Sequence, residues 1–285
     1  MNAQNQSPYY FIPHPSRHPI TASIGLLCMM ASLASWINGD ALAPIGVFVG
    51  LAWLLFVLWH WFGDAISESE GGQYGKQVDK SYRWSMSWFI FSEVMFFCAF
   101  FGALFYTREF AQALLGSLDS KLLWPDFAAV WPNNGPANLV SHFKPMQPWP
   151  VPTINTALLL SSGATLTVAH HALQHNERKK TIVWLAATIL LGVIFLFMQG
   201  FEYFHAYNEL NLKLTSGAYG STFFLLTGFH GFHVTLGALM LSVVLVRVIR
   251  GHFKPDHHFA FEGAAWYWHF VDVVWLGLYV VVYWL

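Results

Sequence analysis

The sequence predicts an all-α, polytopic membrane protein with seven transmembrane helices. Hydrophobic residues make up 55% of the 285 residues and charged residues only 10%, and the mean hydropathy is +0.44. These values fall outside the range of soluble domains. Seven apolar stretches approach or exceed the roughly 20 residues that a helix needs to cross a bilayer. Because no internal repeat or low-complexity tract divides the chain, we expect one membrane domain over residues 1–285.

The composition also excludes some classes of function. The formal net charge is -1 and no Lys- or Arg-rich run longer than three residues exists, so the chain has no basic face for nucleic acid. Cys28 and Cys98 lie singly in apolar runs, where a cysteine behaves as a small hydrophobic residue. Two such cysteines form neither a disulfide framework nor a zinc motif, and they indicate no redox role.

The expected helices follow one another closely, with one long gap. Helices one and two fall within 1–63 and helices three to seven within 84–285. The spans are 20–37, 43–62, 84–107, 153–173, 181–204, 218–246 and 261–284. Ala41-Leu42-Ala43 after the first span has the small-x-small form of a signal-peptide cleavage site. The preceding segment is long and carries only Arg17 as a fixed positive charge, which favours a retained first helix.

The third span contains the most informative residue, Glu93, well inside the apolar run from Trp88 to Tyr106. An ionised side chain at mid-membrane costs about 2.5–3.5 kcal/mol on insertion scales, so such residues are rare and usually functional. Desolvation favours the neutral form of a carboxyl. We therefore expect Glu93 to be largely neutral and to have a functional role.

The long gap, 108–152, is rich in Pro, Asn and Trp, which break helices and suit a cap at the membrane interface. We expect a loop on the outer face. In the fourth and sixth spans, the small residues of 161–165 and the glycines Gly228, Gly231 and Gly237 predict close helix packing. In the seventh span, His269 and Asp272 lie three apart and predict a polar pair facing the bundle interior.

The distribution of Lys and Arg predicts the orientation, because cytoplasmic loops carry the excess. With the N-terminus inside, the inner segments hold Arg17, Lys76, Lys80, Arg83, Arg178, Lys179, Lys180, Arg247, Arg250 and Lys254. The outer segments hold only Arg108, Lys121, Lys144 and Lys213. We therefore expect a cytoplasmic N-terminus and an outer C-terminus, with Glu93 nearer the inner face.

The fourteen histidines raise the hypothesis of a metal site, because imidazole is the commonest ligand for Fe, Cu and Zn. The segment 202–205 has the Glu-x-x-His spacing of di-iron sites, and His171 and His175 form an i, i+4 pair. In the predicted topology these two groups lie at opposite ends of the membrane and share no ion. His230 and His233 alone are a weak signal. We expect no metal site and no catalytic centre on this chain.

The acids within the membrane spans leave a second function possible for this protein, that of a transporter. Glu93, Glu202 and Asp272 are acids of the kind that form proton relays, which favours a transporter. The spans show no inverted repeat and no matching pair of broken helices, which argues against one. The residues by themselves therefore indicate an accessory or transport subunit with a protonatable Glu93, or else a membrane di-iron or haem enzyme if metal is bound.

Several long motifs together resemble subunit III of the haem-copper cytochrome c oxidases. They are Phe91–Phe97, Ala169–Ala172, Tyr219–Phe224, Thr227–Val234 and the stretch that runs from His257–Glu262 through Tyr283–Trp284, and they occur in the order typical of that family. The resemblance covers nearly the whole chain. The first two spans match more loosely, through Trp61–Asp64 and Glu68–Ser69.

The resemblance implies a subunit with no redox cofactor, bound to the catalytic subunit I, which with its partners carries haem and copper. Further partners would be subunit II, small accessory subunits, phospholipids and, for the complex, cytochrome c. The family's first two helices are splayed from a five-helix bundle and leave a cleft for phospholipids. The implied role is to support proton uptake, stability and turnover of subunit I. The implied location is the bacterial inner membrane, or the mitochondrial inner membrane in a eukaryote, with a cytoplasmic N-terminus and a periplasmic C-terminus.

The resemblance also implies roles for individual residues. Glu93 would line the lipid cleft and react with carbodiimide. Arg83 and Arg247 would contact lipid headgroups, since a bidentate Arg suits phosphate. Glu68 and Trp61 would also belong to this lipid site. The chain departs from the family pattern at Gly63, Ser67 and Tyr74, where headgroup contacts of the family would be altered.

Overall fold

The computed structural model describes residue 11, residues 15–137 and residues 140–285. Within these residues the regular structure is helical, apart from one bridge between Lys254 and His257. Seven helices are long and apolar enough to cross a membrane. The predicted all-α fold with seven transmembrane helices is confirmed. The chain separates into two compact units, Met1–Tyr82 and Arg83–Leu285.

The first unit is built on a hairpin of α1 (His18–Ile37) and α2 (Ala43–Glu70). Small residues bring the two helices together: a Cβ atom on Gly50 would lie 2.9 Å from the Met29 Cα atom. The indole of Trp53 donates a 3.0 Å hydrogen bond to the Thr21 carbonyl. Helix α2 continues past the predicted end at residue 62, because the polar residues that follow include no proline and remain helical up to Gly71.

The predicted end of the third span is also wrong. Helix α3 (Lys76–Phe105) continues through the π-helical turn η1 (Tyr106–Ala111) and α4 (Gln112–Leu115) as one helix of 40 residues. A helix of that length is about 60 Å long, twice the hydrocarbon thickness. The charged residues Arg108 and Glu109 predicted that a loop starts there. Charged residues mark where a helix leaves the hydrocarbon, but the helix itself can continue beyond that point. The loop begins only at Gly116.

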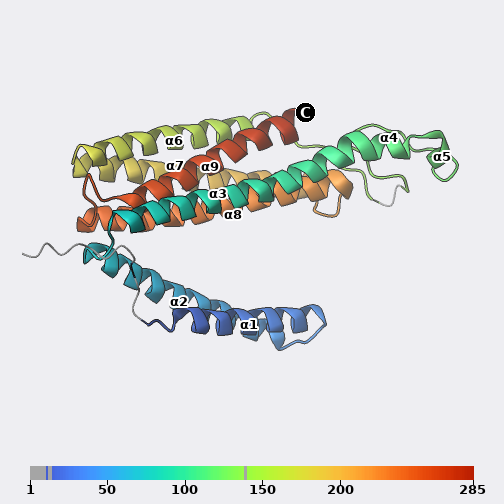
Figure 1. Ribbon diagram of the computed structural model, residues 1–285. Helices are drawn as coiled ribbons and strands as arrows, with labels where there is room; N and C mark the ends of the chain where they lie inside the picture. The colour runs from blue at the N-terminus through green and yellow to red at the C-terminus, as the bar shows by residue number, and fades with distance from the viewer. Residues whose placement is uncertain (1–10, 12–14, 138–139) are drawn as a thin grey trace, which may run out of the picture. The chain divides into compact units, whose positions relative to one another are not determined.

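The second unit also contains α6 (Val151–Gln174), α7 (Arg178–Asn208), α8 (Gly217–Arg250) and α9 (Phe259–Leu278), and α9 ends in the π-helical turn η2 (Tyr279–Trp284). Figure 1 shows these helices side by side, and short connections make successive helices antiparallel. The C-terminal ends of α6 and α8 and the N-terminal ends of α7 and α9 therefore lie at the same end of the unit.

Trp268 lies at the centre of this bundle and is fully buried. Cβ atoms on Gly192 of α7 and Gly237 of α8 would lie 2.5 Å and 2.8 Å from its ring, so both positions need glycine for close packing. The indole NH donates a 2.9 Å hydrogen bond to Ser162 of α6. The packing predicted for the small residues is thus confirmed for Gly237. It is wrong for Gly231, where a Cβ atom would meet no other side chain within 4 Å.

Helix α3 packs on α8 and α9 through large aromatic side chains rather than small ones. Phe97 is buried, and its ring lies 5.1 Å from the ring of His233 and 6.2 Å from that of Phe270. Phe96 contacts Phe229 edge to face at 4.9 Å. Aromatic contacts of this kind bury area and fix ring geometry at a wider spacing between helix axes.

Among the described residues between Gly116 and Pro150, the short helix α5 (Leu118–Lys121) is the only helix. Its second half packs around Tyr219 at the start of α8. The Phe143 ring stacks on Tyr219 at 5.8 Å, and the Tyr219 hydroxyl accepts a hydrogen bond from the Met146 backbone NH. These contacts anchor the loop to the bundle end where α8 begins. The peptide bonds before Pro132 and Pro150 are cis.

Candidate functional site

Glu93 of α3 faces His233 of α8, with 2.8 Å between Oε2 of the carboxyl and Nε2 of the ring. The His233 side chain is 7% exposed and that of Glu93 is 23% exposed. Tyr267 stacks on the His233 ring at 6.2 Å. The acid that the sequence places alone in the third span thus has a partner on another helix.

The hydrogen bond of the other ring nitrogen of His233, Nδ1, shows how many protons the Glu93–His233 pair holds. Nδ1 lies 2.6 Å from the Phe229 carbonyl oxygen, which only accepts hydrogen bonds, so Nδ1 carries a proton. The contact between Nε2 and Glu93 then contains one proton, bound either to the carboxyl or to the ring. Both forms are neutral overall. The pair therefore removes the charge cost that makes a lone intramembrane acid unfavourable.

Arg83, near the start of α3, is engaged at the end of the second unit. Its guanidinium forms an ion pair with Glu262 in the first turn of α9, and it lies 5.3 Å from the centre of the Phe259 ring. The other carboxylate oxygen of Glu262 faces His258 at 3.2 Å and His170 of α6 at 3.8 Å. A four-residue cluster thus joins three helices at this end.

Arg247, the other arginine expected at lipid headgroups, is only 8% exposed. Its guanidinium lies 4.5 Å from the centre of the Phe253 ring. Stacking of this kind is typical of Arg and stabilises a buried cation. The Arg83 side chain is 37% exposed, so it is the more accessible of the two arginines.

Trp61 and Glu68 lie on α2 in the first unit, and each has a partner within that unit. Trp61 stacks on His18 at 5.9 Å, and His18 Nε2 lies 2.7 Å from the Asp64 carboxylate. The Tyr74 hydroxyl donates a 2.7 Å hydrogen bond to Glu68. Burial, with hydrogen bonds to Tyr82 and Glu68, raises the pKa of Tyr74 far above its usual value, so this hydroxyl remains a donor.

The polar pair predicted on the seventh span is brought together, with 3.4 Å between His269 Nδ1 and Asp272 Oδ2. Asp272 is buried against α6, where Gly163 leaves room for its carboxylate, and the His269 side chain is 43% exposed. The pair thus extends from the bundle interior to its surface.

Glu202 has a partner that sequence reasoning missed. The acid is 1% exposed, and Tyr283 of η2 donates a 2.7 Å hydrogen bond to it. His205 lies instead beside Glu209, with 3.1 Å between His205 Nδ1 and Glu209 Oε2. The acid and the histidine of the Glu-x-x-His segment therefore have different partners and do not face each other. His171 and His175 lie at the other end of the antiparallel pair α6 and α7, as the topology predicted. No pattern along the sequence reveals a cross-helix partner such as Tyr283 or His233.

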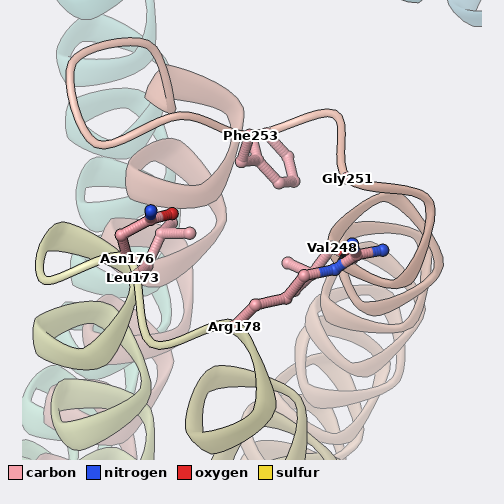
Figure 2. Close-up of a pocket in the computed structure, with 6 residues that line it drawn as sticks. All are labelled: Leu173, Asn176, Arg178, Val248, Gly251 and Phe253. Carbon is pink, nitrogen blue, oxygen red and sulfur yellow. Dashed lines mark hydrogen bonds between the residues drawn. The ribbon is translucent and has the colours of Figure 1, made fainter.

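A small cavity lies where α6, α7 and α8 meet, beside the loop that follows α8 (Figure 2). Its volume of about 30 Å³ suits a water molecule rather than a substrate. Arg178 reaches across this region from the start of α7 and donates hydrogen bonds to the carbonyl oxygens of Val248 and Ile249. These contacts satisfy backbone groups at the end of α8, which identifies the region as a structural cap.

Comparisons with known proteins agree with this architecture. The sequence model of the family described as cytochrome c oxidase subunit III matches residues 8–285. Among curated proteins, the chain is 42% identical over 281 residues to cytochrome c oxidase subunit 3 of Tetraodon nigroviridis, with 98% of each chain covered. It is 43% identical to that of Latimeria chalumnae and 42% identical to that of Cyprinus carpio, each with 98% of both chains covered. The chain therefore belongs to the cytochrome c oxidase subunit III family, whose members are subunits of an oxidase complex.

Proposed function

We propose that this chain is a non-catalytic subunit of a haem-copper cytochrome c oxidase, bound mainly to the catalytic subunit I. Family membership and the seven membrane-spanning helices support the proposal. Haem and copper would be carried by partner subunits, and cytochrome c would deliver electrons to the complex. Subunit II and small accessory subunits complete the set of expected partners. The location would be a bacterial inner membrane or a mitochondrial inner membrane.

The Glu93–His233 pair is the observation that carries a more specific role in proton uptake. The two side chains hold one proton between them, at 2.8 Å, and the Glu93 side chain is partly exposed. If one proton enters this pair at one side while another leaves at the other side, the pair stays neutral, so it can pass protons on without holding net charge in the membrane. We infer that it assists proton delivery to subunit I, and that its loss slows turnover without changing the chemistry at haem and copper.

Phospholipid binding is the second part of the proposed role. Arg83, with its partly exposed side chain at the end of the second unit, is the strongest candidate for a headgroup contact. Arg247 would contribute through the small fraction of its surface that is exposed. Trp61 and Glu68 would contribute from the first unit. Lipid phosphorus measured in preparations of the wild type and of Arg83→Gln tests this, and unchanged lipid content would contradict it.

The whole proposal is tested by purifying the chain from its membrane in a mild detergent through an affinity tag. We expect haem absorbance and copper to co-purify with it. A preparation without haem absorbance would contradict the oxidase assignment. Ion or substrate flux by the chain alone in vesicles would instead support a transporter.

Glu93→Gln gives a sharper test of the pair. A hydrophobic carbodiimide reacts with protonated carboxyls, so we expect it to label the wild type at Glu93 and not to label the variant. Because Gln can still donate a hydrogen bond to His233 Nε2, the variant should insert and assemble, with its effect confined to turnover or proton uptake. Failure to assemble would show that Glu93 is mainly structural.

Glu177→Gln is the matched control. Glu177 lies in the turn between α6 and α7, and its hydrogen bond from Lys180 lowers the pKa of its carboxyl. The group is therefore ionised at neutral pH and should not react. Labelling should be the same in this variant as in the wild type. Labelling that persists in Glu93→Gln would show that another acid is the reactive group.

A further inference from the structure

Three potential metal-ligand atoms converge where α6 ends and α9 begins. They are Nε2 of His170, Nε2 of His258 and Oε1 of Glu262. The two ring nitrogens are 3.3 Å apart, and Glu262 Oε1 lies 3.2 Å from His258 Nε2 and 3.8 Å from His170 Nε2. Among the described residues, this is the group of three such side chains whose ligand atoms all lie within 4.8 Å of one another.

These distances match one face of a tetrahedral metal site. Zinc binds imidazole nitrogen at about 2.0–2.1 Å and carboxylate oxygen at about 2.0–2.2 Å. At a tetrahedral angle, two such ligand atoms on one ion lie about 3.3–3.5 Å apart. One ion would therefore fit between the three atoms with shifts of a few tenths of an ångström in the side chains.

The hydrogen bond on the far side of His258 orients this ring as a ligand. Its Nδ1 lies 3.2 Å from the Lys254 carbonyl oxygen, which only accepts hydrogen bonds, so Nδ1 carries a proton in the neutral ring. Nε2 then directs a lone pair at the Glu262 carboxylate, which is also an acceptor. Two acceptors at 3.2 Å repel each other unless a cation or a proton lies between them. A backbone carbonyl behind a ligating histidine is the usual outer partner in zinc sites.

Glu262 is oriented in the same way. One carboxylate oxygen is held by Arg83, and the other is directed at the two histidines. Bound carboxylates in metal sites commonly have their second oxygen held by such a partner. The side chains of His170, His258 and Glu262 are 25%, 8% and 14% exposed, so the group is mostly enclosed but accessible from one side.

We propose that His170, His258 and Glu262 bind one divalent transition-metal ion of the zinc class. Two imidazoles and one carboxylate are a ligand set that suits this ion, and a water molecule would complete the tetrahedron from the open side. The ion would tie the end of α6 to the start of α9, next to the ion pair that holds α3. The site is a structural clamp, and its existence does not depend on the function proposed above.

The test uses the full-length chain, purified in mild detergent with any partners it retains, treated with a chelator and titrated with zinc chloride alone. We expect one zinc equivalent to be lost, or its Kd to rise by more than about tenfold, in His170→Gln and in His258→Gln, since even outer-shell changes cost about 10–100-fold. Zinc-edge X-ray absorption of the wild type should show two imidazole ligands at about 2.0 Å.

Two control variants make the result specific. His257→Gln changes the exposed histidine next to His258 and should leave zinc binding unchanged. His175→Gln removes the histidine whose ring centre lies 4.3 Å from that of His171, an alternative surface pair. Zinc lost in His175→Gln but retained in His258→Gln would overturn the proposal, as would equal binding in all variants.

If a histidine variant does not fold, the effect of zinc on thermal stability still tests the proposal. Zinc should raise the midpoint of thermal unfolding of the wild type and of His257→Gln, because a ligand that binds only the folded state stabilises it. The near-isosteric Glu262→Gln should show a much smaller rise. The same rise in Glu262→Gln as in the wild type would contradict the clamp.

Discussion

At the scale of single residues, three acids of the second unit are paired across helices, whereas Asp272 pairs with His269 on its own helix. Glu93 has His233, Glu202 has Tyr283, and Glu262 has Arg83. Each pair joins side chains from two different helices, so each also fixes how those helices pack. An acid without such a partner would leave a charge or an unsatisfied oxygen in a medium that offers neither water nor counter-ions.

Tyr283→Phe tests the value of one such pair. The change removes the donor to Glu202, which is 1% exposed, and leaves a buried acceptor unsatisfied. We expect a loss of about 1–3 kcal/mol in the free energy of unfolding, measured by denaturant titration in detergent. Tyr207→Phe alters a tyrosine that is 46% exposed and should change stability little. Equal losses in the two variants would show that the hydrogen bond to Glu202 is not the stabilising contact.

At the scale of the helices, two kinds of packing hold the second unit together. Helices α6 and α8 approach α9 closely, and Gly192 of α7 leaves room for the outer edge of the Trp268 ring. Helix α3 is held at a greater distance by aromatic rings around Phe97. Small residues allow backbone contact in lipid, where burial of apolar surface gives no net driving force between helices.

Gly192→Ala tests the close contact on α7. The new methyl group would lie 2.5 Å from the fully buried Trp268 ring, so the ring or the helix has to shift. We expect a destabilisation of about 1–3 kcal/mol from overpacking. Gly200→Ala, on the same helix, places its methyl group where no other side chain lies within 4 Å. It should be neutral or stabilise by up to about 1 kcal/mol, because glycine is a poor helix former. Thermal unfolding midpoints compare the two, and a stable Gly192→Ala would contradict this packing.

Arg178 links the start of α7 to the end of α8 through hydrogen bonds to two carbonyl oxygens. We expect Arg178→Gln to speed hydrogen exchange of the amides around Gly251, because the last turn of α8 loses its cap. Arg178→Lys should restore little of the protection, since an ammonium group lacks the fixed fork of a guanidinium. Slow exchange in both variants would mean that the cap does not depend on Arg178.

At the scale of the whole molecule, the distribution of positive charge predicts how the protein is oriented in the membrane. Because successive helices are antiparallel, their ends lie alternately at the two membrane faces. One end of the second unit holds Arg83, Arg178 and Arg247, together with Lys179 and Lys180. The opposite end carries the long loop, anchored on Tyr219. The excess of positive charge predicts that the first of these ends faces the cytoplasm or, in a mitochondrion, the matrix.

Cysteine labelling tests that orientation. In a background with Cys28 and Cys98 replaced by Ser, Lys179→Cys and Lys213→Cys place a thiol in exposed positions at opposite ends of α7. A membrane-impermeant maleimide added from the outer side should label Lys213→Cys only. Labelling of Lys179→Cys from that side would reverse the predicted topology.

Much of the fold and part of the site follow from patterns along the chain. The seven spans, the single acid in the third span and the small residues around 161–165 are each visible in one stretch of sequence. The ends of α2 and α3 are not, because hydropathy reports where a helix leaves the hydrocarbon and not where its hydrogen bonds end. Gly231 was assigned a packing role that the neighbouring helices do not require.

The sequence by itself determined that the chain crosses a membrane as seven helices and belongs with an oxidase subunit family, since length, hydropathy and motifs are local properties. Only the tertiary structure decided which groups share a proton or an ion pair. His233 is distant from Glu93 in the sequence, and so is His170 from Glu262, because contacts between antiparallel helices join residues whose separation depends on connection lengths and packing angles. For that reason, an acid that looked isolated in its own helix proved to be half of a neutral pair.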